Sequence, residues 1–313
     1  MQCLILVIGL AGLWAGTELT IKGAVSVAKK LGLSEFIVGA AILSVGSDLP
    51  ELAIAIQVAI DNLGAGDASN IVVGSAIGST IGQIGLVLGV AALMTHLTLT
   101  RRMIYRHGVV VMLGSIILLA IVGLDEIVTQ TEGLILIGVY LIYFFALWTD
   151  VGKNGTEEER NGRNLPKALF YLFVGFGIVI YSAELTVTSA IEVARLLDVK
   201  ETLVAILLIG LGTSLPELSI SVAAALKKKA HMSVGNLIGS NIFDTLVPIG
   251  AAAAISRVNF DDNILVHELP YLFLLSAMVL FFFARGTGVY RHEAFIILGF
   301  YGAYVIAKVY GAL

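Results

Sequence analysis

The feature that most constrains this chain is a series of ten predominantly apolar runs. They lie near residues 3–28, 36–60, 70–95, 104–123, 127–148, 167–194, 202–226, 232–255, 264–284 and 290–311. Each run is long enough to cross a bilayer as a helix, which takes about 20 residues. None shows the alternation of a β-barrel strand. The sequence therefore predicts an all-α polytopic membrane protein with ten transmembrane helices.

Composition argues against several other classes of protein. Charged residues make up 13% of the 313 residues, against about 25% in soluble domains, and the spans leave no room for a soluble catalytic domain. The net charge of −4 argues against nucleic-acid binding. A single cysteine, Cys3, excludes a disulfide framework and a cysteine-based metal cluster. We expect no enzyme activity, no cofactor and no nucleic-acid partner.

One polar stretch divides the chain into two halves of five runs. It predicts a first five-helix repeat at 1–148, a linker at 149–165 and a second repeat at 166–313. Lys and Arg gather in the loops on the linker's side of the membrane, for example at Lys29, Arg101 and Lys227, and such loops stay cytoplasmic. We therefore expect a multi-pass protein of the cell membrane with both termini outside. The sequence does not define the oligomeric state, and a monomer is compatible with it.

The two halves carry the same pair of motifs. GSDLPEL at 46–52 matches GTSLPEL at 212–218, and VGSAIGSTIGQ at 73–83 matches VGNLIGSNIFD at 234–244. Five runs separate equivalent points, so the second copy enters the membrane in the opposite orientation. Inverted repeats with interrupted helices are typical of secondary transporters, whose sites lie near the midplane where the repeats meet.

Acidic residues outnumber basic residues inside the apolar runs. A buried unpaired charge costs several kcal/mol, so carboxylates without a basic partner are expected to hold protons or cations. Lys22 follows Glu18 by four residues, and this spacing predicts a pair on one helix face. The basic residue inside the runs is Lys22, and the acidic residues are Glu18, Asp48, Glu51, Glu184, Glu217 and Asp244.

Side chains that carry oxygen recur at helical spacing in the repeated motifs, and Ca²⁺ and Na⁺ prefer oxygen ligands. Pro50 and Pro216 cannot donate to the carbonyls of Gly46 and Gly212, so each proline interrupts its helix. We predict one cation site shared by the two repeats. Its candidate ligands are Ser44, Ser47, Asp48, Glu51, Ser79, Gln83, Gly210, Thr213, Ser214, Glu217, Ser240 and Asp244.

Over essentially its whole length, the chain resembles the sodium/calcium exchanger branch of the calcium/cation antiporter superfamily, in its prokaryotic form. The resemblance implies that Glu51 and Glu217 are central calcium ligands. It implies that Ser47, Thr213, Ser79, Ser240 and Asp244 bind sodium or calcium, with the backbone carbonyls of Ser44 and Gly210. It also implies that the first and sixth spans form a mobile pair that slides to alternate access.

The first repeat departs from the family pattern at two positions. Asp48 stands where Ser is usual, and Gln83 stands where Asn is usual. Asp48 lies one turn from Glu51, and two carboxylates this close repel each other, which favours a proton on one of them.

The predicted function is a secondary active cation antiporter that exports Ca²⁺ in exchange for Na⁺ by alternating access at a midplane carboxylate site. An H⁺-coupled exchanger of Ca²⁺ or another divalent cation remains open, because the coupling ion and the stoichiometry depend on Asp48 and Gln83. A cation channel needs a continuous pore, and a site enclosed between repeats argues against one.

Overall fold

The computed structural model describes residues 2–63, 69–99, 101–108, 110, 114, 118, 126–149, 164–196, 214–261, 264–286 and 288–310. Six helical segments in these ranges are long and apolar enough to cross a membrane, and a bent helix pair makes a seventh. They are α1 (Gln2–Leu31), the bent pair from α2 (Glu35–Ile37) through η1 (Val38–Leu43) and α3 (Ser44–Ser47) to α4 (Leu49–Asn62), α5 (Ser69–Gly82) with η2 (Gln83–Val87) and α6 (Leu88–Met94), α9 (Gln130–Thr149), α11 (Leu165–Leu196), α14 (Ala230–Ile255), and η4 (Ile264–Glu268) with α15 (Leu269–Gly286).

Shorter elements correspond to the remaining predicted spans. α13 (Leu215–Leu226) is the second half of the span predicted near 202–226, and α16 (Arg291–Val309) is the last span. The span near 104–123 begins with α7 (Arg101–Met103) and η3 (Ile104–Gly108). Most of that span, the first half of the 202–226 span and most of the 149–165 linker lie outside the described residues. The all-α polytopic architecture is confirmed, and the described helices are consistent with ten spans.

Two small antiparallel sheets relate the two halves of the chain. β1 (Leu97–Thr98) pairs with β4 (Gly288–Val289), and β2 (Ile127–Val128) pairs with β3 (Val258–Asn259). β1 and β3 follow equivalent spans of the two halves, and β2 and β4 precede equivalent spans. Exchanging the halves therefore converts one sheet into the other, as two inverted five-helix repeats require.

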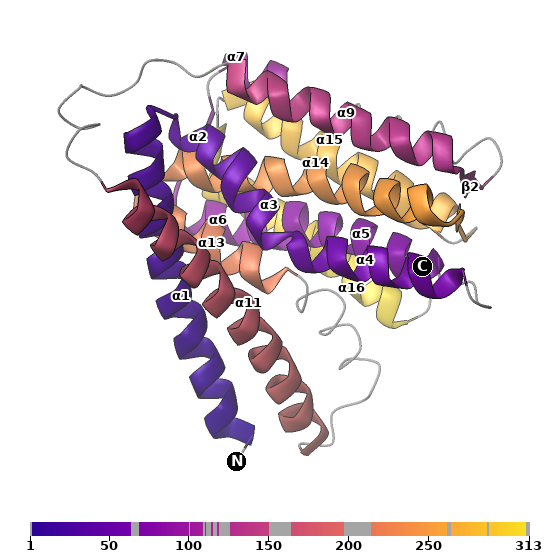
Figure 1. Ribbon diagram of the computed structural model, residues 1–313, viewed down its shortest axis with the longest axis horizontal. Coiled ribbons are helices and arrows are strands. Elements are labelled where there is room, and N and C mark those ends of the chain that lie inside the picture. Colours follow the sequence, from indigo (N-terminus) through magenta and orange to yellow (C-terminus); the bar gives the residue numbers. More distant parts are fainter. Residues whose placement is uncertain are drawn as a thin grey trace.

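The first and sixth spans pack against each other and project away from the other helices (Figure 1). Glycines of α1 face α11 along this contact. A Cβ added at Gly16 or Gly23 would collide with backbone atoms of Val179 or Leu172. Small residues allow this close approach between membrane helices, where lipid supplies no hydrophobic drive for association. The glycine seam therefore holds α1 and α11 together as an antiparallel pair.

The central helix of the remaining bundle is α14. Most of its side chains are buried, and it packs against α9, η1, α4, α13 and α5. Figure 1 shows α14 between α9 and α4, and it packs against both. α14 therefore contacts elements of both repeats, namely α9, η1, α4 and α5 of the first and α13 of the second.

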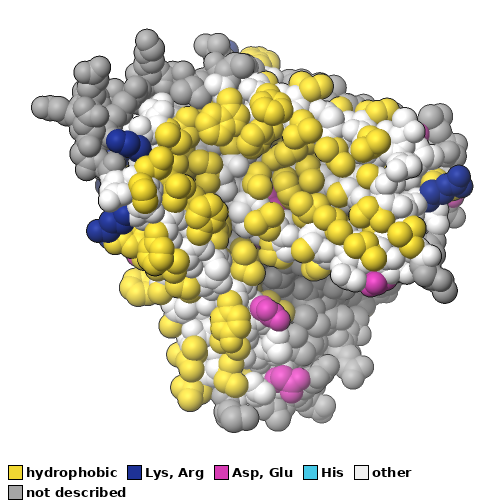
Figure 2. Space-filling model, viewed as in Figure 1, with side chains coloured by type: hydrophobic (Ala, Val, Ile, Leu, Met, Phe, Trp, Pro, Cys, Tyr) yellow, Lys and Arg dark blue, Asp and Glu magenta, His cyan; other side chains and the backbone are white. Residues whose placement is uncertain are grey.

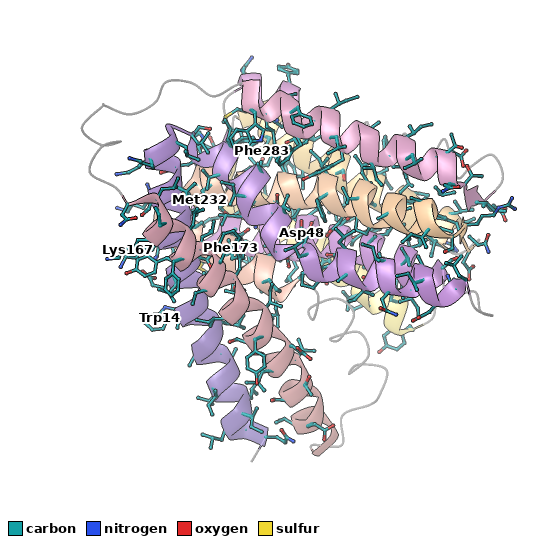
Figure 3. The ribbon with its side chains drawn as sticks, in the orientation of Figure 1. Trp14, Asp48, Lys167, Phe173, Met232 and Phe283 are labelled. Carbon is teal, nitrogen blue, oxygen red and sulfur yellow. The ribbon has the colours of Figure 1, made fainter. Side chains whose placement is uncertain are left out.

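The outer surface is apolar, as a lipid-facing surface must be. Hydrophobic side chains cover the middle of the face in Figure 2, and Lys and Arg lie near its edges. Trp14 on α1 and Phe173 on α11 are exposed, whereas Asp48 lies deep within the bundle (Figure 3).

The predicted pair between Glu18 and Lys22 is wrong. Glu18 pairs instead with Lys227, at 2.6 Å between Oε2 and Nζ. Lys22 lies over the ring of Tyr171, 5.0 Å from its centroid. Helix spacing correctly puts Glu18 and Lys22 on neighbouring turns, but tertiary packing brings a closer partner to each.

Candidate cation site

The two repeated motifs each start a helix at the same point and in the same way. Asp48 precedes α4 with φ −90° and ψ 2°, and Ser214 precedes α13 with φ −91° and ψ 4°. Each is followed by a proline in the first turn of the next helix, where a missing N–H costs nothing. The first break bends its span by 43°. The predicted interruption is therefore confirmed in the first repeat, and in the second repeat the residues before Ser214 lie outside the described residues.

The breaks place acidic side chains at the starts of two helices. Glu51 lies in the first turn of α4, and Glu217 lies in the first turn of α13. Glu51 is 3% exposed and Glu217 is fully buried. The first turn of a helix favours negative charge, because its backbone N–H groups point toward it.

α14 joins both parts of the first repeat's motif. Ser240 on α14 donates to Oδ1 of Asp48 at 2.9 Å, and Ser47 donates to the same oxygen at 3.0 Å. One turn further along α14, Asp244 accepts from Ser79 at 2.9 Å and from the Gln83 amide at 2.8 Å, both at Oδ2. One helix of the second repeat thus binds two segments of the first.

A glycine explains how Ser240 reaches its partner. A Cβ added at Gly239 would meet the Ala40 carbonyl and the Ser44 hydroxyl. The neighbouring η1 and α3 therefore lie directly against the α14 backbone. This close approach brings Ser240 into hydrogen-bonding distance of Asp48.

We use the term acid cluster for Asp48, Glu51, Glu217 and Asp244 with the adjacent Ser214 and Gln83. Seven of its oxygens are buried and have no hydrogen-bond partner in the described part of the chain. A buried polar atom without a partner costs about 1–3 kcal/mol, and more when it is charged. These atoms are Asp48 Oδ2, Glu51 Oε2, Gln83 Oε1, Ser214 Oγ, both carboxylate oxygens of Glu217, and Asp244 Oδ1.

The acid cluster lacks compensating positive charge within the described ranges. The ion pairs found there are Lys227–Glu18, Lys229–Glu35, Arg285–Glu293 and Lys308–Glu268, and none includes a carboxylate of the cluster. The described residues hold no group of three acidic, His or Cys side chains that converges like a compact metal cage. The cluster is a distributed set of carboxylate, amide and hydroxyl oxygens, which suits hard cations better than zinc or copper.

The described structure does not add three of the predicted ligands to the acid cluster. The Ser44 carbonyl already accepts from the Asp48 backbone N–H at 3.0 Å, and it lies 3.1 Å from the Ser47 hydroxyl, whose single proton can go to this carbonyl or to Asp48. Gly210 and Thr213 lie outside the described residues. The remaining nine predicted positions lie in or directly beside the acid cluster.

Sequence reasoning missed two buried polar residues beside the acid cluster. Asn236 on α14 donates to the Ser221 hydroxyl of α13 at 3.0 Å, and both side chains are fully buried. Their signal was present in the sequence, because Asn236 precedes Ser240 by four residues and Ser221 follows Glu217 by four.

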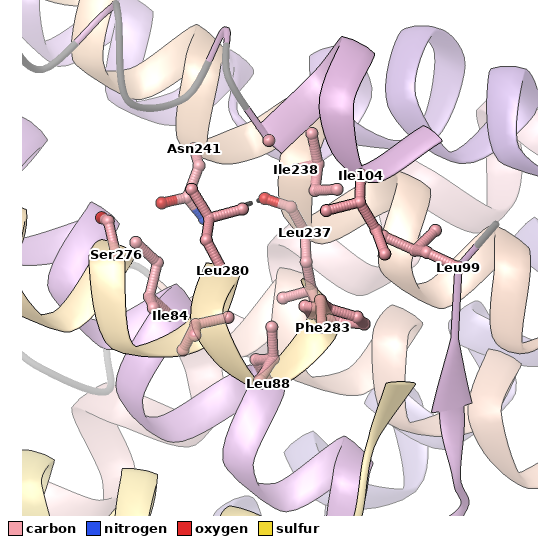
Figure 4. A pocket seen from close by; sticks show the side chains of 12 residues that line it. Ile84, Leu88, Leu99, Ile104, Leu237, Ile238, Asn241, Ser276, Leu280 and Phe283 are labelled. Carbon is pink, nitrogen blue, oxygen red and sulfur yellow. Dashed lines mark hydrogen bonds between the residues drawn. The ribbon is translucent and has the colours of Figure 1, made fainter. Parts of the chain in front are cut away.

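A cavity of about 40 Å³ lies between α14, α15 and η2 (Figure 4). Its lining is apolar except for Asn241 and Ser276, whose Oδ1 and Oγ atoms have no hydrogen-bond partner among the described residues. The Asn241 amide donates to the Leu237 carbonyl of its own helix at 2.8 Å. No residue of the acid cluster is among the residues that line the cavity.

Comparisons with known proteins agree with the resemblance in the motifs. The family model for sodium/calcium exchanger protein matches residues 1–149 and 167–310. An uncharacterized membrane protein of Methanocaldococcus jannaschii, MJ0091, is 31% identical over 300 residues, which cover 94% of this chain and 93% of that protein. The sodium/calcium exchanger MaX1 of Methanosarcina acetivorans is 28% identical over an alignment of 349 positions, which covers 98% of each chain.

A solved structure has the same fold. The sodium-calcium exchanger NCX_Mj, soaked with 10 mM Na⁺ and zero Ca²⁺, matches with a TM-score of 0.83 and 27% sequence identity. The match covers 98% of both chains.

Proposed function

The chain belongs to the sodium/calcium exchanger family, and from that premise we propose that it exports Ca²⁺ in exchange for Na⁺ at the acid cluster. The observation that carries the proposal is the set of seven buried oxygens without partners. They come from both repeats and carry an excess of negative charge. Cations bound by these oxygens would supply both the missing partners and the missing charge.

The division of roles follows from position. Glu51 and Glu217, one from each repeat, would hold the divalent ion between them. The hydroxyls of Ser47, Ser79 and Ser240, with the carboxylate of Asp244, would complete the monovalent sites. Because Ca²⁺ and Na⁺ would compete for shared oxygens, binding of one promotes release of the other.

Electrostatics explains exchange in place of leak. An empty acid cluster exposes uncompensated carboxylates to the low dielectric of the membrane, which is costly. The transition between access states therefore favours an occupied cluster. Sliding of α1 and α11 along the bundle would open the cluster to each side in turn, with the protein in the cell membrane and both termini outside.

A second coupling ion has a specific observation in its favour. Asp48 adds a carboxylate where the family usually has Ser, and its Oδ2 has no partner among the described residues. Repulsion between Asp48 and the other acids favours a proton or an additional cation there. The alternative is H⁺-coupled exchange of Ca²⁺ or of another divalent cation.

The test is uptake of radiolabelled Ca²⁺ into proteoliposomes of the whole chain. Vesicles are loaded with Na⁺ or with K⁺ at equal pH, and a third set carries a pH gradient alone. Uptake that requires the outward Na⁺ gradient supports sodium/calcium exchange. Uptake driven by the proton gradient alone supports the alternative. Absence of Ca²⁺ flux in all three sets contradicts both proposals.

A further inference from the structure

A buried amide lies next to the acid cluster but outside the set of predicted ligands. Asn236 is fully buried on α14, where its Nδ2 donates to Ser221 Oγ on α13. Its Oδ1 has no hydrogen-bond partner in the part of the chain that the structure describes. A buried amide oxygen in this condition favours a ligand that brings positive charge.

Helical spacing connects this amide with the acid cluster on both helices. Asn236 lies four residues before Ser240, and Ser221 lies four residues after Glu217. Residues four apart share a helix face and lie about 6 Å from each other along the axis. The Asn236–Ser221 pair therefore continues the row of cluster oxygens toward the α13–α14 connector, residues 227–229.

The first repeat has no equivalent pair. The repeated motifs align Ser75 with Asn236 and Ala55 with Ser221. A serine and an alanine cannot form an amide–hydroxyl hydrogen bond. The row of oxygens is therefore extended at one end of the acid cluster only.

Charge at the connector is compatible with the passage of a cation. Three consecutive lysines form the connector and would repel an approaching cation. Lys227 pairs with Glu18 and Lys229 pairs with Glu35, both from the first repeat. Two of the three positive charges are therefore balanced where the row of oxygens approaches the surface.

We propose that Asn236 and Ser221 form an approach site, where a divalent cation exchanges part of its hydration shell for protein oxygens before it enters the acid cluster. The inference rests on the proposed function. Ca²⁺ takes six to eight oxygen ligands, so replacing its waters in steps avoids complete dehydration at once. Under the predicted topology the connector faces the cytoplasm, the side from which an exporter collects Ca²⁺.

The test must separate the two faces of the protein, and Cys3 provides the means. It is the single cysteine of the sequence and is exposed near the start of α1. α1 has 30 residues and spans about 45 Å, and its far end leads into α2, where Glu35 pairs with the connector. Cys3 therefore lies at the membrane face opposite the connector.

The experiment uses vesicles that contain at most one protein on average. A membrane-impermeant biotin maleimide labels vesicles with Cys3 outside, and streptavidin removes them from those with the connector outside. The apparent KM for external Ca²⁺ is then measured in both fractions. We expect Asn236→Leu, which keeps the volume and removes the oxygen, to raise this KM about fivefold in connector-outside vesicles and to leave the other fraction within twofold.

Two matched variants accompany the measurement. Asn241→Leu removes an amide from the same helix, also buried with an Oδ1 that has no partner among the described residues, but one that lines the cavity between α14, α15 and η2. It should leave KM unchanged in both fractions. Ser221→Ala removes the hydroxyl that holds the Asn236 amide, and should give a smaller change in the same fraction.

An equal rise of KM at both faces, or an equal effect of Asn241→Leu, would overturn the approach site while leaving the proposed exchange intact. Wild-type protein without Ca²⁺ flux would instead contradict the proposed function. If Asn236→Leu does not fold, the KM of Ser221→Ala in the two vesicle fractions tests the approach site instead.

Discussion

The two repeats start α4 and α13 with nearly the same backbone angles around different distributions of charge. The breaks at Asp48 and Ser214 agree within a few degrees in φ and ψ, yet one carries a carboxylate and the other a hydroxyl. The next motif reverses this difference, with the amide of Gln83 in the first repeat and the carboxylate of Asp244 in the second. Each repeat therefore contributes two carboxylates, but at different positions.

This comparison separates the geometry of the site from its ion preference. Proline in the first turn determines where α4 and α13 begin, and both repeats retain it. The position of the second carboxylate in each repeat is independent of the break. We expect variants of the shared acids to affect all transport, and variants of the exchanged positions to affect coupling.

The largest expected effect comes from the acids that both repeats share. Glu51→Gln and Glu217→Gln each remove a central negative charge while keeping the volume. We expect each to lower Na⁺-dependent Ca²⁺ uptake in proteoliposomes by at least about 100-fold, because a divalent ion loses half of its central charge compensation. Glu184→Gln, at an exposed position of α11, is the control and should retain activity. A strong loss in only one of the two variants would show that the repeats do not share the divalent ion.

The second effect concerns the motif on α5 and α14. Asp244→Asn replaces a carboxylate that accepts from Ser79 and Gln83, and should weaken Na⁺ dependence by about tenfold, since a charged oxygen is lost from the cluster. The double variant Gln83→Asp with Asp244→Asn moves the carboxylate to the first repeat. Recovery of Na⁺ dependence in the double variant would indicate that total charge matters more than position.

The third effect concerns the helix break. Asp48→Ser makes the two breaks alike and removes the carboxylate that is unusual in the family. We expect it to reduce the dependence of Ca²⁺ uptake on pH or on a further cation by several-fold, because repulsion within the acid cluster decreases. The measurement is uptake across a series of pH values and Na⁺ concentrations. An unchanged pH and Na⁺ dependence would remove the support for H⁺ coupling. Adding Ser214→Asp to this variant moves the carboxylate from the start of α4 to the start of α13, and uptake then tests whether either position can hold it.

The smallest effect concerns the contact between α1 and the α13–α14 connector. Lys227→Gln removes the ion pair with Glu18, in which both side chains are partly exposed. Exposed ion pairs contribute about 0.2–1 kcal/mol, so exchange rates should change less than about fivefold. Lys228→Gln is the matched control. A change above tenfold would mean that this pair controls access as well as packing.

The family motifs and their acids could be predicted from the sequence because they depend on local spacing. The starts of α4 and α13 follow from proline, and the convergence of the repeats follows from their inverted order. Asn236 and Ser221 were missed because each looks ordinary on its own helix. Their hydrogen bond joins two helices, and such a contact depends on how α13 and α14 are rotated against each other.

The pairing of charged side chains shows the same limit. Spacing indicated Glu18 with Lys22, yet Glu18 contacts Lys227 of the other repeat. A charged residue on a helix face can pair with a residue on its own helix or on any neighbouring helix. Tertiary packing decides among them, since the distance between helices depends on small residues such as Gly16 and Gly23 at their contact.

The sequence by itself determined that the chain is an all-α membrane protein with duplicated, proline-broken acidic motifs. Hydropathy and spacing suffice for this, because a bilayer requires long apolar helices with internally satisfied backbones. Only the tertiary structure decided that Ser240 binds Asp48, that Gln83 binds Asp244, and which oxygens are without a partner. Those contacts depend on how the helices are rotated and how closely they approach. Side-chain shape controls both, and the spacing of residues in the sequence does not predict them.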